Sequence, residues 1–165
     1  MHLFLTLSTL LVALTHASPI IYPRAGAGGP IVKPIPQTCT VSTPLVHNAD
    51  TTNCSNNITT NTADYKPTTA FASAHSLYEA YFDLPKATEE LWTQCSQQCY
   101  GYGDEGDCRS AVFAQAVPVP EGYFGAEGGE LVSACLLFDE YLAADDLEKA
   151  VEGQWIDERA GNIYC

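Results

Sequence analysis

Two cysteines on one predicted helix constrain the fold of this chain most strongly. Ala87, Leu91, Cys95 and Cys99 recur every four residues, which places them on one face of an α-helix. Side chains at this spacing have Cβ atoms about 5–6 Å apart, whereas a disulfide requires about 3.5–4.5 Å. We therefore expect Cys95 and Cys99 each to pair with a cysteine elsewhere, so that the helix is joined to the rest of the fold at two points.

The cysteine content indicates an oxidising compartment. The chain contains seven cysteines, at positions 39, 54, 95, 99, 108, 135 and 165, and oxidation would make them a disulfide framework with one thiol left over. Structural zinc sites use Cys-x2-Cys pairs. The chain has one Cys-x3-Cys and no second pair, so we predict no metal and no cofactor.

The first 17 residues resemble a secretory signal peptide. Residues 1–17 contain a short apolar run, and Thr15-His16-Ala17 before Ser18 offers a small-residue cleavage site. No later stretch approaches the roughly 20 apolar residues of a membrane helix. The C-terminal residues N-I-Y-C carry no hydrophobic tail for a lipid anchor. We expect a secreted, extracellular protein with no membrane partner.

The charge of the chain opposes binding to polyanions. The chain contains seven Lys and Arg residues and 20 Asp and Glu residues, which gives a formal net charge of −13. Nucleic acids and anionic membranes attract basic surfaces instead. The acidic residues are spread from Asp50 to Glu158 rather than gathered in one tail. We interpret them as a solubilising surface and predict no nucleic-acid partner.

Residues 18–69 are predicted to form an irregular arm. Residues 18–37 contain closely spaced prolines and glycines, which remove amide donors and favour extended structure. Arg24 offers a processing site there. Residues 38–69 are rich in Thr, Asn and Ser and poor in apolar side chains, so we expect no packed core before residue 70.

The arm also carries two N-glycosylation sequons. These are Asn53-Cys54-Ser55 and Asn57-Ile58-Thr59. Early bridging of Cys54 would hinder modification of Asn53, so Asn57 is the better acceptor. We expect a glycoprotein.

Residues 70–165 have the apolar content of a packed domain. Runs at 110–117 and 131–138 predict two strands. The spacing within 77–83 fits either a strand or a helical turn. Two further patterns are a helix-like one at 142–151 and a pair of short closing strands at 153–157 and 162–164.

The loop from Pro118 to Gly129 is the candidate ligand-binding segment. Its 12 residues exceed the usual hairpin connection of about 2–5. Tyr123 and Phe124 at its centre could stack on sugar rings or anchor a partner protein. The alternative is that the two rings fold back and cover the sheet.

The histidines give no catalytic pattern. The chain after residue 17 contains only His47 and His75. Ser73 and Ser76 lie close to His75 but lack the G-x-S-x-G context of a hydrolase nucleophile, and a triad also needs a third group that orients the base. We assign no catalytic residue.

The acidic residues do not define a site either. Members of the pairs 89–90, 139–140 and 145–146 are adjacent in sequence and diverge on a helix or strand, whereas glycoside hydrolysis needs two carboxyl groups about 5–9.5 Å apart across a cleft. The run 104–107, D-E-G-D, lacks the alternating ligands and distal Glu of a calcium loop. We interpret that run as a turn between Cys99 and Cys108.

The order of cysteines and elements resembles a PAN/Apple-type domain. The matching features are a helix with Cys95-x3-Cys99, Cys108 followed by A-V-F-A-Q on a strand, Cys135-Leu-Leu-Phe on the next strand, and terminal Cys165. The segments C-S-Q-Q-C-Y-G-Y-G-D-E-G-D-C and G-N-I-Y-C are similar to a group of small secreted fungal proteins of unassigned function. The resemblance covers roughly residues 71–165. It implies an α+β fold, a small disulfide-stapled antiparallel sheet cradling one helix.

The resemblance also implies the disulfide pairing. The helix cysteines would pair as Cys95–Cys135 and Cys99–Cys108. A third bridge between the two ends of the domain would be Cys54–Cys165 or Cys39–Cys165, and we assign Cys54 to it. Cys39, in the arm, would then be free to form a covalent dimer.

These observations predict a secreted, non-enzymatic binding module that recognises carbohydrate or an extracellular protein at a cell surface or wall. An alternative is a secreted effector or inhibitor that acts on a foreign protein. A third, less favoured hypothesis is a small hydrolase.

Overall fold

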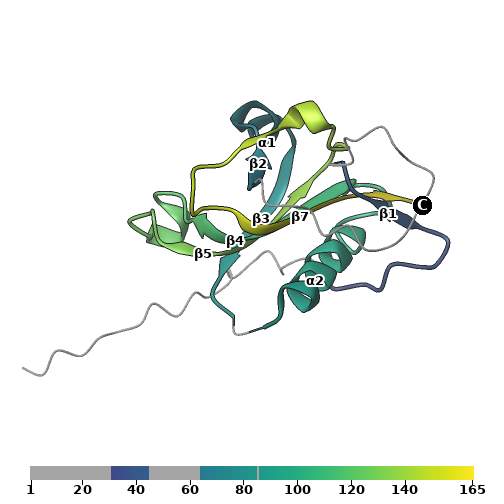
Figure 1. Ribbon diagram of the computed structural model, residues 1–165. Helices are drawn as coiled ribbons and strands as arrows, with labels where there is room; N and C mark the ends of the chain where they lie inside the picture. The colour runs from purple at the N-terminus through teal and green to yellow at the C-terminus, as the bar shows by residue number, and fades with distance from the viewer. Residues whose placement is uncertain (1–30, 45–63, 85) are drawn as a thin grey trace, which may run out of the picture.

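The computed structural model describes residues 31–44, 64–84 and 86–165. The predictions for the signal peptide, Arg24, His47, Asn53, Cys54 and Asn57 lie outside the described residues. The described residues form a small α+β fold of α-helices and antiparallel sheets (Figure 1). This part of the chain contains two α-helices and three disulfides. None of the helices within these ranges is both long and apolar enough to cross a membrane.

A five-stranded antiparallel sheet forms the centre of the fold. Its strand order is β1-β7-β4-β5-β3, and the strands span Thr40–Ser42 (β1), Ser76–Phe82 (β3), Ser110–Pro118 (β4), Leu131–Phe138 (β5) and Ile156–Tyr164 (β7). The central strands β4 and β5 are buried along most of their length. This is why they read as continuous apolar runs rather than as an alternation.

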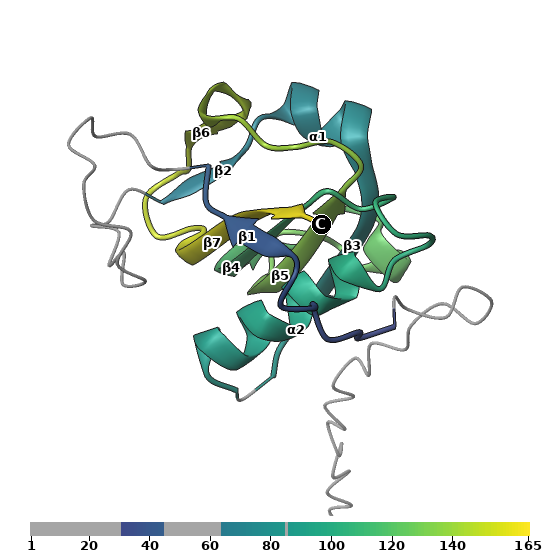
Figure 2. The ribbon, with the colours of Figure 1, turned by 90° about the vertical axis from the view of Figure 1, so that its right-hand side faces the viewer.

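The remaining elements cover the two faces of this sheet. They are β2 (Tyr65–Pro67), α1 (Thr69–His75), α2 (Thr88–Tyr100), the 3-10 turns η1 (Tyr123–Gly125) and η2 (Ala144–Asp146), and β6 (Leu147–Lys149). Helix α2 lies on one face, and α1 with the antiparallel β2–β6 ribbon lies on the other (Figure 2). Both faces of the sheet are therefore covered, whereas the resemblance implied a sheet that cradles one helix.

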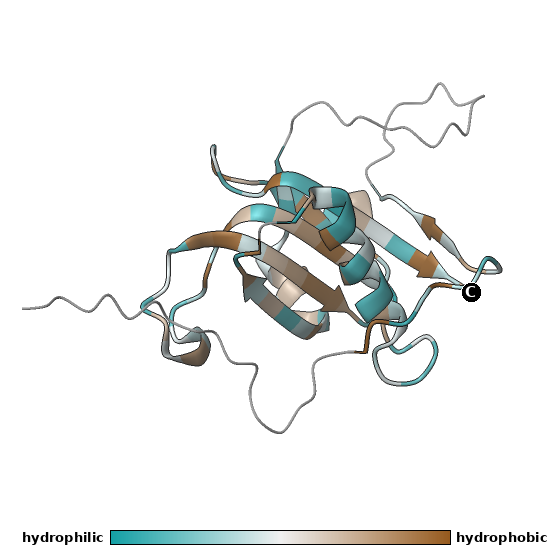
Figure 3. Cartoon of the chain, turned by 90° about the horizontal axis from the view of Figure 1, so that it is seen from below, coloured by the Kyte–Doolittle hydropathy of each residue, from teal (hydrophilic) through white to brown (hydrophobic). Residues whose placement is uncertain are grey.

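Helix α2 forms where the four-residue spacing of Leu91, Cys95 and Cys99 predicts a helix. Glu89 and Glu90 occupy its first turn, where the positive end of the helix dipole favours acidic side chains. Leu91, Cys95 and Cys99 are buried against the sheet, as their spacing predicts. Seen from below, α2 presents mostly hydrophilic residues outward while the strands behind it are largely hydrophobic (Figure 3).

The end of α2 is set by a close backbone approach at Gly101. The amide of Lys33 donates to the carbonyl of Gln97 at 3.2 Å, and the Lys33 ammonium lies 4.8 Å from the centroid of the Tyr100 ring. A Cβ at Gly101 would collide with the carbonyl of Ile31. Glycine is required there, and residues 31–33 of the predicted arm pack against the helix.

The sheet has a hydrophobic core on each face. The core under α2 combines the buried helix residues with side chains from β4, β5 and β7, including Phe113, Leu137 and Ile163. The opposite core contains Phe71 of α1, whose ring centroid lies 5.2 Å from that of Phe138. Burying one such side chain stabilises the fold by about 1.5–3 kcal/mol, so both layers contribute.

Two of the three disulfides confirm the predicted pairing. Cys95–Cys135 joins α2 to β5, and Cys99–Cys108 joins α2 to the segment before β4. Their Cα atoms are 5.6 and 5.2 Å apart.

The third disulfide corrects the prediction. Cys165 pairs with Cys39, not with Cys54. The reason is strand pairing: β1 runs antiparallel to β7 with Thr40 opposite Tyr164, which brings the flanking cysteines to a Cα–Cα distance of 4.1 Å. Cys39 then has no thiol for the covalent dimer predicted through it.

Other elements differ from the sequence-based expectations. Most of the ambiguous segment 77–83 belongs to strand β3. The closing strands predicted at 153–157 and 162–164 are replaced by one strand, β7, which begins only at Ile156. The helix-like spacing within 142–151 gives η2 and β6 instead of an α-helix. Strands β1 and β2 come from the predicted arm, so the packed fold extends N-terminal to residue 70.

Candidate functional site

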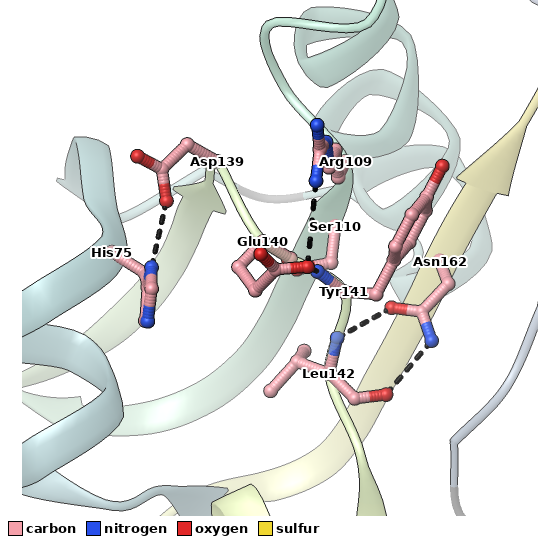
Figure 4. Close-up of polar contacts among 8 residues, drawn as sticks. All are labelled: His75, Arg109, Ser110, Asp139, Glu140, Tyr141, Leu142 and Asn162. Atoms are coloured by element: carbon pink, nitrogen blue, oxygen red, sulfur yellow. Dashed lines mark hydrogen bonds and ion pairs between the residues drawn. The ribbon is translucent and has the colours of Figure 1, made fainter.

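The candidate site lies at the end of the sheet where β5 stops. The segment Asp139–Leu142 leaves β5 and passes the start of β4 and the end of β7 (Figure 4). Asp139, Glu140 and Tyr141 thereby meet side chains from three other parts of the chain. Charged and aromatic groups gather here at the surface.

Buried polar side chains hold this segment in place. The amide of Leu142 donates to Asn162 Oδ1, and Asn162 Nδ2 donates to the Leu142 carbonyl, both at 2.8 Å (Figure 4). The hydroxyl of Ser110 donates to the Glu140 carbonyl at 2.7 Å. Asn162 and Ser110 are both buried, so their polar groups require these partners and fix the backbone of the site.

A stacked tyrosine pair is the main aromatic feature of the site. The rings of Tyr141 and Tyr164 are 4.6 Å apart at an interplanar angle of 14°. The guanidinium of Arg109 lies 5.4 Å from the centroid of the Tyr141 ring. Tyr164 is 42% exposed, and the next residue, Cys165, is anchored by its disulfide. The pair is therefore anchored beside a disulfide, with Tyr164 exposed and Tyr141 half-buried.

Arg109 and Glu140 form the charged part of the same surface. Glu140 Oε1 lies 3.5 Å from Arg109 Nη1 and accepts a hydrogen bond from the amide of Tyr141 at 2.9 Å. Both charged side chains are more than two-fifths exposed, so solvent screens their attraction strongly. We call Arg109, Glu140, Tyr141 and Tyr164 the tyrosine–arginine surface.

His75 lies beside this surface and forms an exposed pair with Asp139. Its Nδ1 is 2.9 Å from Asp139 Oδ1 (Figure 4), which is how a carboxylate orients a catalytic base. The adjacent hydroxyl, that of Ser76, donates instead to Glu79 at 3.1 Å. The structure thus brings together a base and an orienting acid but directs the neighbouring serine elsewhere.

The predicted carboxylate pairs diverge into separate contacts. Glu89 binds Arg159 at 2.8 Å, while Glu90 binds Lys86 at 2.9 Å. Asp146 accepts a hydrogen bond from the Ala143 amide at 2.8 Å. Each of these three acidic side chains therefore makes an ion pair or a hydrogen bond within the fold.

The acidic run 104–107 forms a turn. Asp107 Oδ2 accepts from the Asp104 amide at 2.8 Å, and the Asp107 amide donates to the Asp104 carbonyl at 3.1 Å. Across the described ranges, no group of three or more His, Cys, Asp or Glu side chains is arranged to hold a metal ion.

Tyr123 and Phe124 have different surroundings. The ring of Tyr123 lies 4.7 Å from that of Tyr81 in an edge-on arrangement, and its hydroxyl contacts the backbone of β3. Phe124 packs edge-on against Tyr123 at 4.6 Å but remains 55% exposed. This loop is at the opposite end of β5 from the tyrosine–arginine surface. Of the two predicted ligand residues, Tyr123 therefore packs over the sheet, and Phe124 is exposed to solvent.

Glu158 is a second buried polar feature. It is 9% exposed, and its Oε1 has no hydrogen-bond partner among the described residues. Burial raises the pKa of its carboxyl to about 7; Arg159 opposes this shift and Asp64 adds to it. A carboxyl in such surroundings is favoured in its neutral form.

Sequence reasoning missed the tyrosine–arginine surface. Its four residues come from the start of β4, the turn after β5 and the end of β7, and no local spacing connects them. Glu158 could have been found once β7 was recognised as one strand, since it lies on the same face of the strand as the buried Ala160 and Asn162.

Comparisons of this chain with family models, with curated proteins and with solved structures found no match.

Proposed function

We propose that the protein is a secreted, non-enzymatic binding module that recognises carbohydrate through the tyrosine–arginine surface. The observation that carries the proposal is the partly exposed tyrosine stack with a guanidinium–carboxylate pair beside it.

This combination suits a sugar. An aromatic face packs against the C–H face of a sugar ring at low entropic cost because the ring has few rotatable bonds. Arg109 supplies several donors and Glu140 supplies acceptors for hydroxyl groups. The two charges offset each other, which favours a neutral ligand over a strongly charged one.

Classification as a PAN/Apple-like domain is part of the same proposal. Support comes from the two confirmed helix disulfides, from the bridge between the ends of the domain and from a helix packed on an antiparallel sheet. Secretion is supported by the composition of residues 1–17 and by the number of cysteines.

The test is capture of carbohydrate by the mature protein and its variants. Binding is measured on a glycan array and in pull-downs with insoluble polysaccharide. Tyr164→Ala should weaken capture at least about tenfold, equivalent to about 1.4 kcal/mol. Its melting temperature should change little, because Tyr164 is exposed.

Phe124→Ala provides the matched control. It removes an aromatic ring of similar exposure from the opposite end of the sheet and should leave capture unchanged. If Phe124→Ala abolishes binding and Tyr164→Ala does not, the site lies in the loop 118–129. An array without any bound glycan, together with one co-purifying protein, would favour an effector or inhibitor instead.

A further inference from the structure

The three disulfides differ in their exposure to solvent. The cysteines of the two bridges made by α2 are at most 5% exposed, namely Cys95, Cys99, Cys108 and Cys135. In the third bridge Cys165 is exposed and Cys39 is only partly buried. Thiol–disulfide exchange requires a thiolate to reach one of the two sulfur atoms. Of the three bridges, the one between Cys39 and Cys165 is therefore open to a thiol in solution while the protein is folded.

Tyr164 depends on strand β1 for its position. Strand β7 pairs with β4 as far as Asn162, and the Ile163 amide donates to the Arg109 carbonyl at 2.8 Å. Tyr164 lies beyond this pairing, and its strand partner is Thr40 of β1. The tyrosine stack is therefore complete only while β1 stays beside the end of β7.

Strand β1 is weakly held apart from the exposed bridge. It is an edge strand of three residues, and all three are exposed. Segments with few buried contacts and with solvent-exposed hydrogen bonds open locally at a low cost in free energy. The covalent bond between Cys39 and Cys165 prevents this opening, because these two residues flank the pairing of β1 with the end of β7.

We propose that the Cys39–Cys165 bridge is a site of exchange with small thiols, and that opening the bridge releases Tyr164 from Tyr141. The inference rests on the proposed function in one respect, namely that the released ring belongs to the tyrosine–arginine surface. Sugar capture then requires the oxidised protein and is lost in a thiol-rich environment.

The exchange has two steps and consumes two molecules of a small thiol such as glutathione. The first thiolate attacks Cys165 Sγ, the bond between the two cysteine sulfurs breaks, and Cys39 leaves as a thiolate. A second thiolate attacks the sulfur of the attached small thiol, so that Cys165 leaves as a thiolate and a small disulfide is released. The two cysteine thiolates take up the protons that the small thiols lost. The cysteines gain two electrons, and the small thiols lose two.

The other half of the tyrosine stack stays in place when the bridge opens. Asn162 holds the backbone at Leu142 through two hydrogen bonds of 2.8 Å, and the Ser110 hydroxyl donates to the Glu140 carbonyl at 2.7 Å (Figure 4). These contacts link β4, β7 and the segment that carries Tyr141, and β1 takes no part in them. Opening the bridge therefore removes one ring of the pair and leaves the rest of the fold intact.

The experiment treats Cys54→Ser, which retains the six cysteines of the three bridges, with increasing glutathione. Free thiols are alkylated and located by peptide mass spectrometry. Cys39 and Cys165 should be labelled at least about tenfold faster than the four buried cysteines, which react only after a larger opening. Equal or faster labelling of Cys95 and Cys135 would overturn the proposal, because exchange would then enter through the cavity of about 110 Å³ that these two cysteines line.

The tyrosine stack is followed by NMR in the selectively reduced and alkylated protein. The ring-current shifts of Tyr141 and Tyr164 should disappear. Tyr81 and Tyr123, whose rings are 4.7 Å apart, provide the internal control and should keep their shifts, because the fold persists. In the same Cys54→Ser background, replacing both cysteines of the exposed bridge by serine should give the same spectrum without any thiol. A stack that persists after the bridge has opened would overturn the proposal.

Sugar capture separates this inference from the proposed function. The selectively reduced protein should capture glycans at least about tenfold more weakly than the oxidised protein, the loss expected for Tyr164→Ala. If the oxidised protein captures no sugar, the proposed function fails, whereas labelling and ring-current shifts still decide whether exchange opens the bridge and releases Tyr164. Equal capture in both states, with the stack lost, would contradict the proposed site alone.

Discussion

At the scale of single residues, the buried carboxyl of Glu158 makes stability depend on pH. Its folded pKa of about 7 is above the ordinary value of 4.5, so the folded state holds a proton that the unfolded state releases between these values. The stability that this group contributes is then fully present below about pH 4.5 and is lost as the pH rises through about 7.

We expect the wild-type protein to be less stable at pH 8 than at pH 5 by up to about 3 kcal/mol through this group. Glu158→Gln cannot titrate, so its unfolding free energy should lose this pH dependence and exceed that of the wild type at pH 8. Denaturant unfolding at several pH values measures both. Glu127→Gln, in an exposed loop, is the control. If the unfolding free energy of Glu158→Gln still falls with pH as in the wild type, Glu158 is not the group that causes this pH dependence.

The two neighbouring loop aromatics should respond differently to truncation. Tyr123 is half-buried against Tyr81, so Tyr123→Ala should cost about 1–3 kcal/mol, less than the 3–5 of a fully buried ring. Phe124 is 55% exposed, so Phe124→Ala should stay within about 0.5 kcal/mol of the wild type. Calorimetry compares the melting temperatures. Equal losses in the two variants would show that Phe124 also covers the core.

At the scale of elements, helix α2 depends on its disulfides. The buried face of α2 is short, and Cys95–Cys135 links it to the central strand β5. Arg159 adds a contact from β7 to Glu89, near the start of α2. That ion pair is partly exposed and contributes little by itself, so the covalent links dominate the attachment of the helix.

We predict that Cys135→Ser lowers stability by about 4 kcal/mol, the chain-entropy value for the loop that this bridge closes. The variant should be secreted poorly, with a melting temperature reduced by about 10 °C or more. Secretion yield and thermal unfolding are the measurements. Cys54→Ser, outside the three bridges, should behave like the wild type. Normal secretion of Cys135→Ser with an unchanged melting temperature would show that the bridge does not stabilise the fold.

At the scale of the whole molecule, the parts predictable from sequence are those set by local spacing. Helix α2 and strands β4 and β5 follow from periodicity and apolar runs, and the helix disulfides follow from the resemblance. Strand β1 could not be found this way, because its three residues are exposed and exist as a strand only through pairing with β7. Helix α1 has seven residues and one buried side chain, Phe71, too little for a helical pattern.

The candidate site was harder to predict than the fold. Tyr141 follows a strand and Tyr164 precedes the terminal cysteine, 23 positions later. Their stacking results from the sheet register and from the hydrogen bonds between Asn162 and Leu142. Single-sequence patterns report local neighbours, whereas this surface is made by contacts between distant segments.

The bridge between Cys39 and Cys165 has a consequence for proteolysis. It joins positions 126 residues apart, so nearly all of the described chain lies inside one covalent ring. One peptide-bond cleavage within that ring opens it but leaves a single molecule, because the two fragments stay tied through the bridge. A nicked protein would keep its full mass until a reducing agent separates the pieces, and β1 would stay beside β7 throughout.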